Sequence, residues 1–266
     1  KILSSEEGLG MTILDRIVEK KKERLVIRKR EMSESMLERS TGSVKPFFAA
    51  GATLITECKK GSPSKGIMVE DYRPVEIARA YERGGSDSLS ILTEEDFFFG
   101  KDADLIDVRR SVSLPILRKD FMIDPYQIKE SYAIGADAIL LIAAILSDEQ
   151  MAEFSQYAFS YGLSVLAEAH DEKEIERIAR IDGVAIGINA RDLRDFSVDL
   201  DRVSRMRSLI PEGRIAVAES GIKSVEDAVR LRNSGFDAFL IGERFVRDGD
   251  PSAAVNSFSS ALKGGR

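Results

Sequence analysis

The sequence has very few of the side chains that build disulfide or metal sites. It contains one cysteine, Cys58, and one histidine, His170, in 266 residues. A single cysteine excludes an internal disulfide framework and is typical of a reducing compartment. One histidine and one cysteine without any ligand spacing also argue against a zinc-type centre. We therefore predict a protein without disulfides and without a metal.

Long hydrophobic runs and an excess of positive charge are also missing. The longest apolar run, residues 138–146, is far shorter than the roughly 20 residues of a transmembrane helix. Residues 1–10 lack the apolar core of a signal peptide. The net charge of −6 argues against a nucleic-acid surface. We predict a cytoplasmic protein that binds neither membranes nor nucleic acid.

The residues that are present predict a regular alternation of strands and helices. Hydrophobic residues make up 43% and charged residues 32%, which is typical of a soluble globular protein with a full core. Residues 11–40 predict a charged helix, and we interpret its basic run at 20–24 as a solvated face. From residue 52 onward a unit of strand, loop and amphipathic helix repeats. The predicted strands are 53–58, 86–92, 114–119, 136–142, 164–168, 184–189, 215–219 and 236–241.

This pattern allows a closed barrel or an open doubly wound sheet. The run from residue 138 is apolar without alternation, as expected of a parallel strand that is buried on both faces. No Gly-x-Gly-x-x-Gly turn follows the first strand, which disfavours the dinucleotide-binding open sheet. We predict an α/β (β/α)8 TIM barrel that forms a single domain over residues 1–266, with residues 1–50 as an N-terminal helical extension.

Polar side chains follow the apolar runs at the ends of most of the predicted strands. The active site of such a barrel lies at the C-terminal ends of its strands. We therefore expect one shared mouth. Its candidate residues are Glu57, Lys59, Thr93, Glu94, Lys119, Glu168, His170, Asn189, Arg191, Glu219, Ser220, Gly221, Gly242 and Glu243.

Two of these residues suggest an acid and a base. A lysine at the end of an apolar strand is costly to desolvate and is usually paired or functional, so we predict that Lys119 is a general acid. We expect nearby cations and partial burial to lower its pKa. Glu168 should stay ionised beside lysines and accept a proton, with the two groups held apart across the mouth.

Two glycine turns suggest an anion site. Ser220-Gly221 follows the seventh predicted strand and Gly242-Glu243 follows the eighth. Barrels often bind phosphate with these two loops, where exposed backbone N–H groups face the ligand. We expect the Glu243 side chain to point away from such a phosphate.

The two rarest side chains have simpler interpretations. His170 precedes Asp171, a predicted helix cap, so we expect a role at the helix start rather than in catalysis. Cys58 alternates toward the helix layer and has no evident base, which argues against a nucleophile.

Five motifs together resemble the indole-3-glycerol-phosphate synthase family. They are ECKKGSPS at 57–64, SILTE at 90–94, LRKDF at 117–121, GINARDL at 187–193 and AESGI at 218–222. The resemblance runs in order from the N-terminal helix to the final helix. It implies a (β/α)8 barrel with an N-terminal extension, and an activity that needs no metal or organic cofactor.

The resemblance also implies a reaction and a set of residues. The family converts 1-(o-carboxyphenylamino)-1-deoxyribulose 5-phosphate to indole-3-glycerol phosphate, with loss of carbon dioxide and water. By position, Lys119 matches the general acid and Glu168 the general base, assisted by Lys59, Glu57 and Asn189. The implied substrate- and phosphate-binding residues are Ser62, Phe98, Phe121, Leu140, Arg191, Ser220, Gly221, Leu240, Gly242 and Glu243.

Two other readings stay open on the residues alone. One is another phosphosugar barrel, such as an isomerase or an aldolase that forms a Schiff base on Lys119. The other is a barrel that binds a phosphorylated metabolite without catalysis, although such a protein should have lost part of the polar set that is intact here. A monomer is the default expectation.

Overall fold

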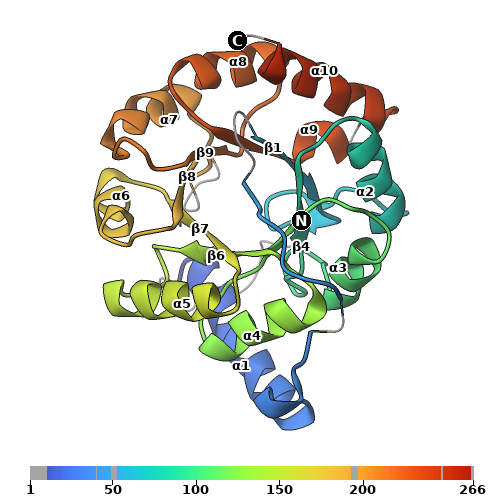
Figure 1. The fold of residues 1–266 in the computed structure, drawn as a ribbon, viewed down its shortest axis with the longest axis vertical. Helices are drawn as coiled ribbons and strands as arrows, with labels where there is room; N and C mark the ends of the chain where they lie inside the picture. Colours follow the sequence, from blue (N-terminus) through green and yellow to red (C-terminus); the bar gives the residue numbers. More distant parts are fainter. Residues whose placement is uncertain (1–10, 40, 49–52, 193–196, 247, 265–266) are drawn as a thin grey trace.

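The computed structural model describes residues 11–39, 41–48, 53–192, 197–246 and 248–264. Within these ranges, parallel strands close into a barrel in the order β1-β10-β9-β8-β7-β6-β5-β4 (Figure 1). The barrel strands are β1 Thr53–Cys58, β4 Ser88–Leu92, β5 Ile116–Lys119, β6 Ala138–Ile142, β7 Ser164–Ala169, β8 Ala185–Asn189, β9 Ala216–Glu219 and β10 Ala238–Ile241. The predicted (β/α)8 barrel is confirmed. Residues 1–10 of the predicted extension and Leu193 of the fourth motif lie outside the described ranges.

Helices alternate with the strands and surround the barrel, as predicted. They are α1 Ile13–Glu31, η1 Glu34–Met36, α2 Pro74–Arg83, α3 Asp102–Arg109, α4 Pro125–Ile134, α5 Asp148–Ser160, α6 Glu172–Ala179, α7 Leu200–Met206, η2 Arg207–Leu209, α8 Val225–Asn233, α9 Glu243–Val246 and α10 Pro251–Lys263. A short hairpin of β2 Gly61–Ser62 and β3 Gly66–Ile67 follows β1. None of the described helices is long and apolar enough to span a bilayer.

Helix starts follow the capping residues of the sequence. Asp124 accepts a hydrogen bond from the backbone N–H of Tyr126 at the start of α4, and Pro125 occupies the first turn. Ser147 and Gln150 form a reciprocal capping box at α5. These caps satisfy N–H groups that no intrahelical partner can reach, so they fix where each helix begins.

Six of the barrel strands begin one or two residues later than predicted, and one buried carboxylate explains part of the difference. Asp137 precedes β6 and is fully buried. Its side chain accepts the backbone N–H of Ile116 and pairs with Arg109 and Arg39. The residue therefore anchors the loops at the base of the barrel, although the sequence alone assigned it to the strand.

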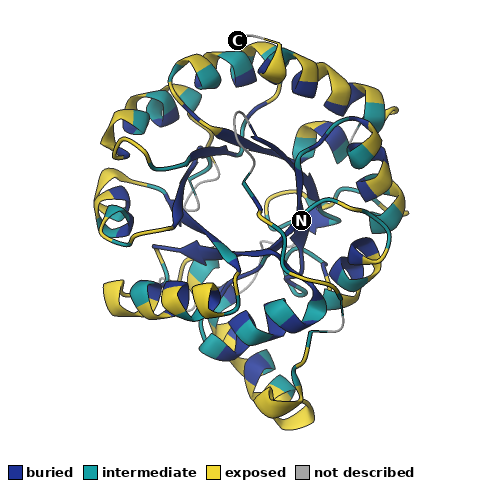
Figure 2. Cartoon of the chain, viewed as in Figure 1, coloured by how far each residue is buried: buried dark blue, intermediate teal, exposed yellow. Residues whose placement is uncertain are grey.

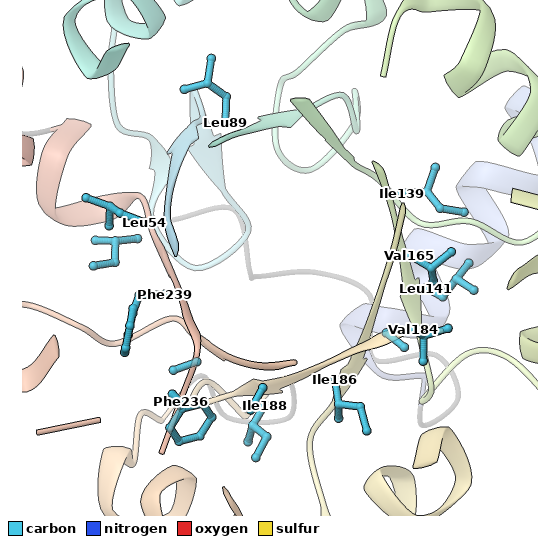
Figure 3. Close-up of a cluster of buried hydrophobic side chains, with 14 of the residues drawn as sticks. Leu54, Leu89, Ile139, Leu141, Val165, Val184, Ile186, Ile188, Phe236 and Phe239 are labelled. Carbon is cyan, nitrogen blue, oxygen red and sulfur yellow. The ribbon is translucent and has the colours of Figure 1, made fainter. Parts of the chain in front are cut away.

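Side chains from the strands form two apolar layers. The outward layer packs between the barrel and the helices, and its labelled members point away from the ring centre in Figure 3. The inward layer fills the barrel and contains Ile55, Leu117, Leu140, Leu166, Val217 and Leu240. Figure 2 shows that the strands are buried along their length, as expected of parallel strands covered on both faces. The apolar packing of the inward layer supports the strand ends that carry the polar residues.

Helix α1 packs on the barrel next to α4 through a buried stripe (Figure 1). Ile17, Lys21 and Leu25 lie four residues apart on one face and are buried. The Lys21 ammonium lies 2.7 Å from the Asp120 carboxylate, directly after β5. The prediction of a solvated basic face is therefore wrong for Lys21, which forms a buried ion pair.

Further ion pairs hold the second half of α1. Arg24 pairs with Asp96 and Glu95 in the loop after β4. Arg28 lies 2.6 Å from Asp102 on α3. It also lies 2.9 Å from Glu130 on α4. Helix α1 is thus attached to the loops and helices around β4 and β5.

We expect the Lys21–Asp120 pair to contribute strongly to stability. Lys21→Ala would leave Asp120 buried with less compensation, at a cost of about 3 kcal/mol in the free energy of unfolding at neutral pH. Despite burial, Lys21 and Arg118 lower the pKa of Asp120 to about 2. A carboxyl with a lowered pKa stabilises the folded chain above its unfolded pKa, so the difference from wild type should shrink as the pH falls from about 4 to about 2.

Urea unfolding at several pH values measures this difference. Lys22→Ala is the matched control, because Lys22 is the next residue of α1 and its pair with Glu19 is exposed. Equal losses of stability in the two variants would contradict a dominant role for the buried pair.

Candidate active site

The ends of four strands bring one ammonium and three carboxylates together. Lys119 ends β5, and its Nζ lies 3.1 Å from Oε2 of Glu219 on β9. The same Nζ lies 3.5 Å from Oε2 of Glu57 on β1 and 4.0 Å from Oε2 of Glu168 on β7. The expected separation of Lys119 and Glu168 across the mouth is wrong, because only one strand lies between β5 and β7 and both side chains point to the barrel axis.

This environment keeps Lys119 charged. Burial alone would lower the pKa of Lys119, but the charges of Glu219, Glu57 and Glu168 raise it above its ordinary value. The prediction of a lowered pKa is therefore wrong. It assumed that other cations would be the nearest neighbours of Lys119, whereas the nearest charged groups are carboxylates.

The second lysine pairs with the first strand. Lys59 Nζ lies 2.7 Å from Oε1 of Glu57, so the Glu57 carboxylate is shared between Lys59 and Lys119. Burial opposes ionisation of Glu57, but these two lysines lower its pKa. Cys58, between them in sequence, is buried in the outward layer, as predicted from alternation. Burial raises the pKa of its thiol, so Cys58 is a poor nucleophile.

Glu168 stays ionised, as predicted. Burial disfavours its charge, but His170, then Lys119 and Asn189, lower the pKa of Glu168 to about 2. His170 precedes the cap Asp171 of α6, which confirms the prediction of its place at a helix start. Its ring also contacts Glu168, at 3.2 Å between Nε2 and Oε1, and the sequence interpretation missed this contact.

Glu219 is the residue whose importance the sequence interpretation underestimated. It is fully buried, and burial together with the charge of Glu168 raises its pKa to about 8, although Lys119 opposes this. A glycine inside β8 was the available signal. A Cβ atom on Gly187 would lie 2.1 Å from Oε1 of Glu219, so only glycine leaves room for this carboxylate. A glycine within a strand often marks such a close approach.

Two adjoining pockets open over these groups, and together they contain every candidate catalytic and binding residue named by the resemblance. The first pocket has an apolar part, formed by Ile13, Leu14, Ile17, Phe98, Phe121, Leu140 and Ile142. Lys119, Glu168, Asn189 and Ser62 also line it. The Phe98 and Phe121 rings lie 6.0 Å apart between centroids and form one wall.

The second pocket is rich in cations and glycine turns. It is lined by Lys65, Lys223, Arg244, Gly221, Leu240 and Gly242. Glu57, Lys59, Arg191, Ser220 and Glu243 line both pockets, so the two form one continuous site. Such a surface can bind an anion through its charges and its backbone N–H groups.

Glu243 does not point away from this anion site, contrary to the prediction. Its carboxylate forms an ion pair with Lys65 of the β2–β3 hairpin and lies 3.4 Å from Nη2 of Arg191. The cations attract the carboxylate into the pocket. An anionic ligand would therefore compete with Glu243 for these cations.

The polar residues after β4 support the site without lining it. The Thr93 hydroxyl donates to Asp120. Glu94 accepts the backbone N–H groups of Asp96, Phe97 and Phe98, which orders the loop that carries the Phe98 ring. Among the residues described, no group of three or more His, Cys, Asp or Glu side chains is placed to hold a metal ion.

Several solved structures have a similar fold but little sequence identity. A 3-hexulose-6-phosphate synthase superposes with a TM-score of 0.62 and 14% identity, over 79% of this chain and 99% of that one. Phosphoribosylanthranilate isomerase from Thermotoga maritima gives a TM-score of 0.59 and 11% identity, over 80% of this chain and 99% of that one. At this identity the likeness shows the fold alone.

Comparison of the sequence is more specific. The family model described as indole-3-glycerol phosphate synthase matches residues 14–258. The protein of that name from Acetivibrio thermocellus is 44% identical over 261 residues, which cover 93% of this chain and 99% of the relative. The one from Campylobacter hominis is 45% identical over 255 residues, covering 91% and 97%. Both matches span nearly the whole barrel and its N-terminal helix, and this chain therefore belongs to the indole-3-glycerol phosphate synthase family.

Proposed function

We propose that this protein converts 1-(o-carboxyphenylamino)-1-deoxyribulose 5-phosphate to indole-3-glycerol phosphate, as a carboxy-lyase of tryptophan biosynthesis. The observation that carries the proposal is the two-part site with a charged centre. An aromatic ring fits the apolar part, a phosphate fits the cationic part, and Lys119 lines the first pocket beside Glu57, which lines both. Family membership supplies the reaction.

Lys119 acts as the general acid of this site. Ring closure requires a polarised substrate carbonyl when an aromatic carbon attacks it. The raised pKa of Lys119 keeps its ammonium available at every working pH, so the positive charge can stabilise the developing oxyanion and supply the proton. The carboxylates of Glu57 and Glu219 orient this ammonium.

Glu168 acts as the general base of the dehydration step. Its carboxylate is ionised and has Asn189 beside it, which lines the same pocket. Lys59 binds the acidic groups of the substrate, and Glu57 holds Lys59 in place at 2.7 Å. This assignment uses groups of opposite charge that already lie in contact.

The remaining residues bind the two ends of the substrate. Arg191 lines both pockets and can pair with the anthranilate carboxylate. The backbone around Gly221 and Gly242, together with Ser220, receives the phosphate. Phe98 and Phe121 enclose the aromatic ring from the side, and Leu140 lies below it.

A Schiff-base aldolase fits this site less well. A lysine that forms a Schiff base must lose its proton, and such lysines have lowered pKa values. Lys119 has the opposite environment, with three carboxylates within 4.0 Å of Nζ. The same argument applies to an isomerase that would use Lys119 as a base.

The direct test is to add the anthranilate-ribulose phosphate substrate to the purified protein. Indole absorbance should appear together with one equivalent of carbon dioxide. A protein that binds the substrate without producing either would be a non-catalytic barrel. The predictions of a single domain, a monomer and a cytoplasmic location stay untested by this assay.

Replacing Lys119 tests the assigned acid. Lys119→Ala should reduce turnover by about 10²- to 10⁴-fold, the range typical of general acid–base groups, while substrate binding stays measurable. Lys101→Ala is the matched control, because Lys101 is 66% exposed and lies outside both pockets. Steady-state kinetics and equilibrium titration of the substrate separate the two effects. Near-normal turnover in Lys119→Ala would remove Lys119 from the mechanism.

Inorganic phosphate should stabilise the folded protein by occupying the cationic pocket. Binding to the folded state alone raises the melting temperature with ligand concentration. Glu243→Gln should strengthen this effect, because the carboxylate that pairs with Lys65 and Arg191 no longer competes. Thermal unfolding in phosphate, compared with chloride at equal ionic strength, measures the shift. An equal response to both salts in both proteins would argue against a phosphate site here.

A further inference from the structure

The only histidine of the chain lies between two carboxylates. Nε2 of His170 is 3.2 Å from Oε1 of Glu168, and Nδ1 is 3.4 Å from Oε2 of Glu174 on α6. The side chain is 14% exposed. Each ring nitrogen therefore faces a carboxylate oxygen. An ionised carboxylate accepts hydrogen bonds and donates none.

The main chain of His170 is fixed on both sides. Its backbone N–H donates to Oε2 of Glu174 at 2.6 Å. The guanidinium of Arg202 on α7 donates to its carbonyl oxygen. Asp171, the next residue, caps α6 by accepting the N–H of Glu174. These contacts hold the imidazole beside Glu168 and limit its movement.

The charges around the ring favour the imidazolium. A neutral imidazole has one donor and one acceptor nitrogen, so one lone pair would face a carboxylate. The imidazolium carries a proton on each nitrogen, so no lone pair faces a carboxylate; both nitrogens lie at ion-pair distance from their carboxylates, outside hydrogen-bond geometry. Burial opposes this charge, but Glu168 and Glu174 raise the pKa of His170 to about 10. The cationic Arg202 contacts the carbonyl oxygen rather than the ring.

Glu168 also faces other charged groups. Oε2 lies 4.0 Å from Nζ of Lys119 on β5. Burial and the charge of Glu168 together raise the pKa of Glu219 on β9. The Lys119 ammonium interacts with three carboxyl groups, those of Glu219, Glu57 and Glu168. A second cation on the Oε1 side therefore contributes directly to keeping Glu168 ionised.

We propose that His170 is a positioning residue, which stays protonated between Glu168 and Glu174 and holds the Glu168 carboxylate charged and directed into the pocket. The proposal rests on the proposed role of Glu168 as the general base. It gives Glu168 two cations on different oxygens, with His170 at Oε1 and Lys119 at Oε2. Glu174 then acts through His170, by compensating the imidazolium charge from the other side.

Nuclear magnetic resonance of the untagged protein tests the charge state directly. Because the chain has one histidine, a single imidazole signal set reports on His170 without assignment. It should show the imidazolium well above pH 7.5. Glu174→Gln should shift its titration midpoint downward by about 1 to 3 pH units, the range expected for loss of an opposite charge at this distance. Glu172→Gln, an exposed position in the same helical turn, should not shift it.

A wild-type imidazole that titrates near pH 6.5, or a midpoint that Glu174→Gln leaves unchanged, would overturn the proposal. Both results would concern the charge state alone and would leave the proposed activity in place.

Kinetics test the effect on Glu168. In His170→Asn the acidic limb of the kcat profile should move upward by about 1 to 3 pH units, because Glu168 loses a cation. KM near neutral pH should change little, and His170→Lys should restore part of the shift. If the wild type makes indole-3-glycerol phosphate and the His170→Asn profile superimposes on it, the positioning role is wrong. If the wild type makes none, the proposed function fails instead.

Discussion

The site depends on one buried ammonium that several carboxylates share. Lys119 reaches the axis of the barrel, where Glu57, Glu168 and Glu219 approach it from three other strands. Isolated charges at this depth would be too costly to keep, so each carboxylate needs the ammonium and the ammonium needs them. The closed ring of parallel strands makes the arrangement possible, because it directs side chains from distant parts of the sequence to one point. Glycine at 187 then gives Glu219 the space that any other side chain would occupy.

The N-terminal helix is part of this arrangement rather than an appendage. Ile13, Leu14 and Ile17 of α1 line the apolar part of the pocket. Lys21, one turn further, forms its ion pair with Asp120, the residue directly after Lys119. The position of the helix and the position of the end of β5 are therefore linked through the adjacent residues Lys119 and Asp120. A substrate with an aromatic ring would contact α1 at one end and the cationic turns of β9 and β10 at the other.

The barrel and the gathering of the named residues around two adjoining pockets were predictable from the sequence, whereas the distances between these residues were not. Apolar runs and caps locate the strands, and alternation correctly places Lys119 inward and Cys58 outward. Alternation says nothing about how far an inward side chain reaches. The contact of Lys119 with three carboxylates, and hence the direction of its pKa shift, could not be derived. The prediction for Lys21 was wrong for a related reason. In the sequence, a buried lysine within a charged run looks the same as its exposed neighbours. Only the structure shows that the buried Asp120 faces it. The sequence analysis named Glu219 as a residue at a strand end. Its importance depends on how closely its carboxylate approaches residues of other strands, Gly187 on β8 and Lys119 on β5.

The proton balance of the proposed reaction gives the carboxylates around Lys119 a second role, which is to restore its proton. Loss of carbon dioxide from an ionised carboxyl group consumes one proton overall, while ring closure and dehydration consume none. Lys119, held protonated by its neighbours, can give that proton to the substrate. Once neutral, it no longer stabilises the carboxylates of Glu57 and Glu168, so these charges favour its reprotonation. Glu219 lies 3.1 Å from Lys119 and has a pKa of about 8, which makes it the carboxyl nearest to exchanging a proton at neutral pH. Glu168, with His170 beside it, has a pKa of about 2 and stays ionised at neutral pH. The two buried glutamates thus have opposite pKa shifts, because burial and the charge of Glu168 raise the pKa of Glu219, whereas His170 and Lys119 lower that of Glu168.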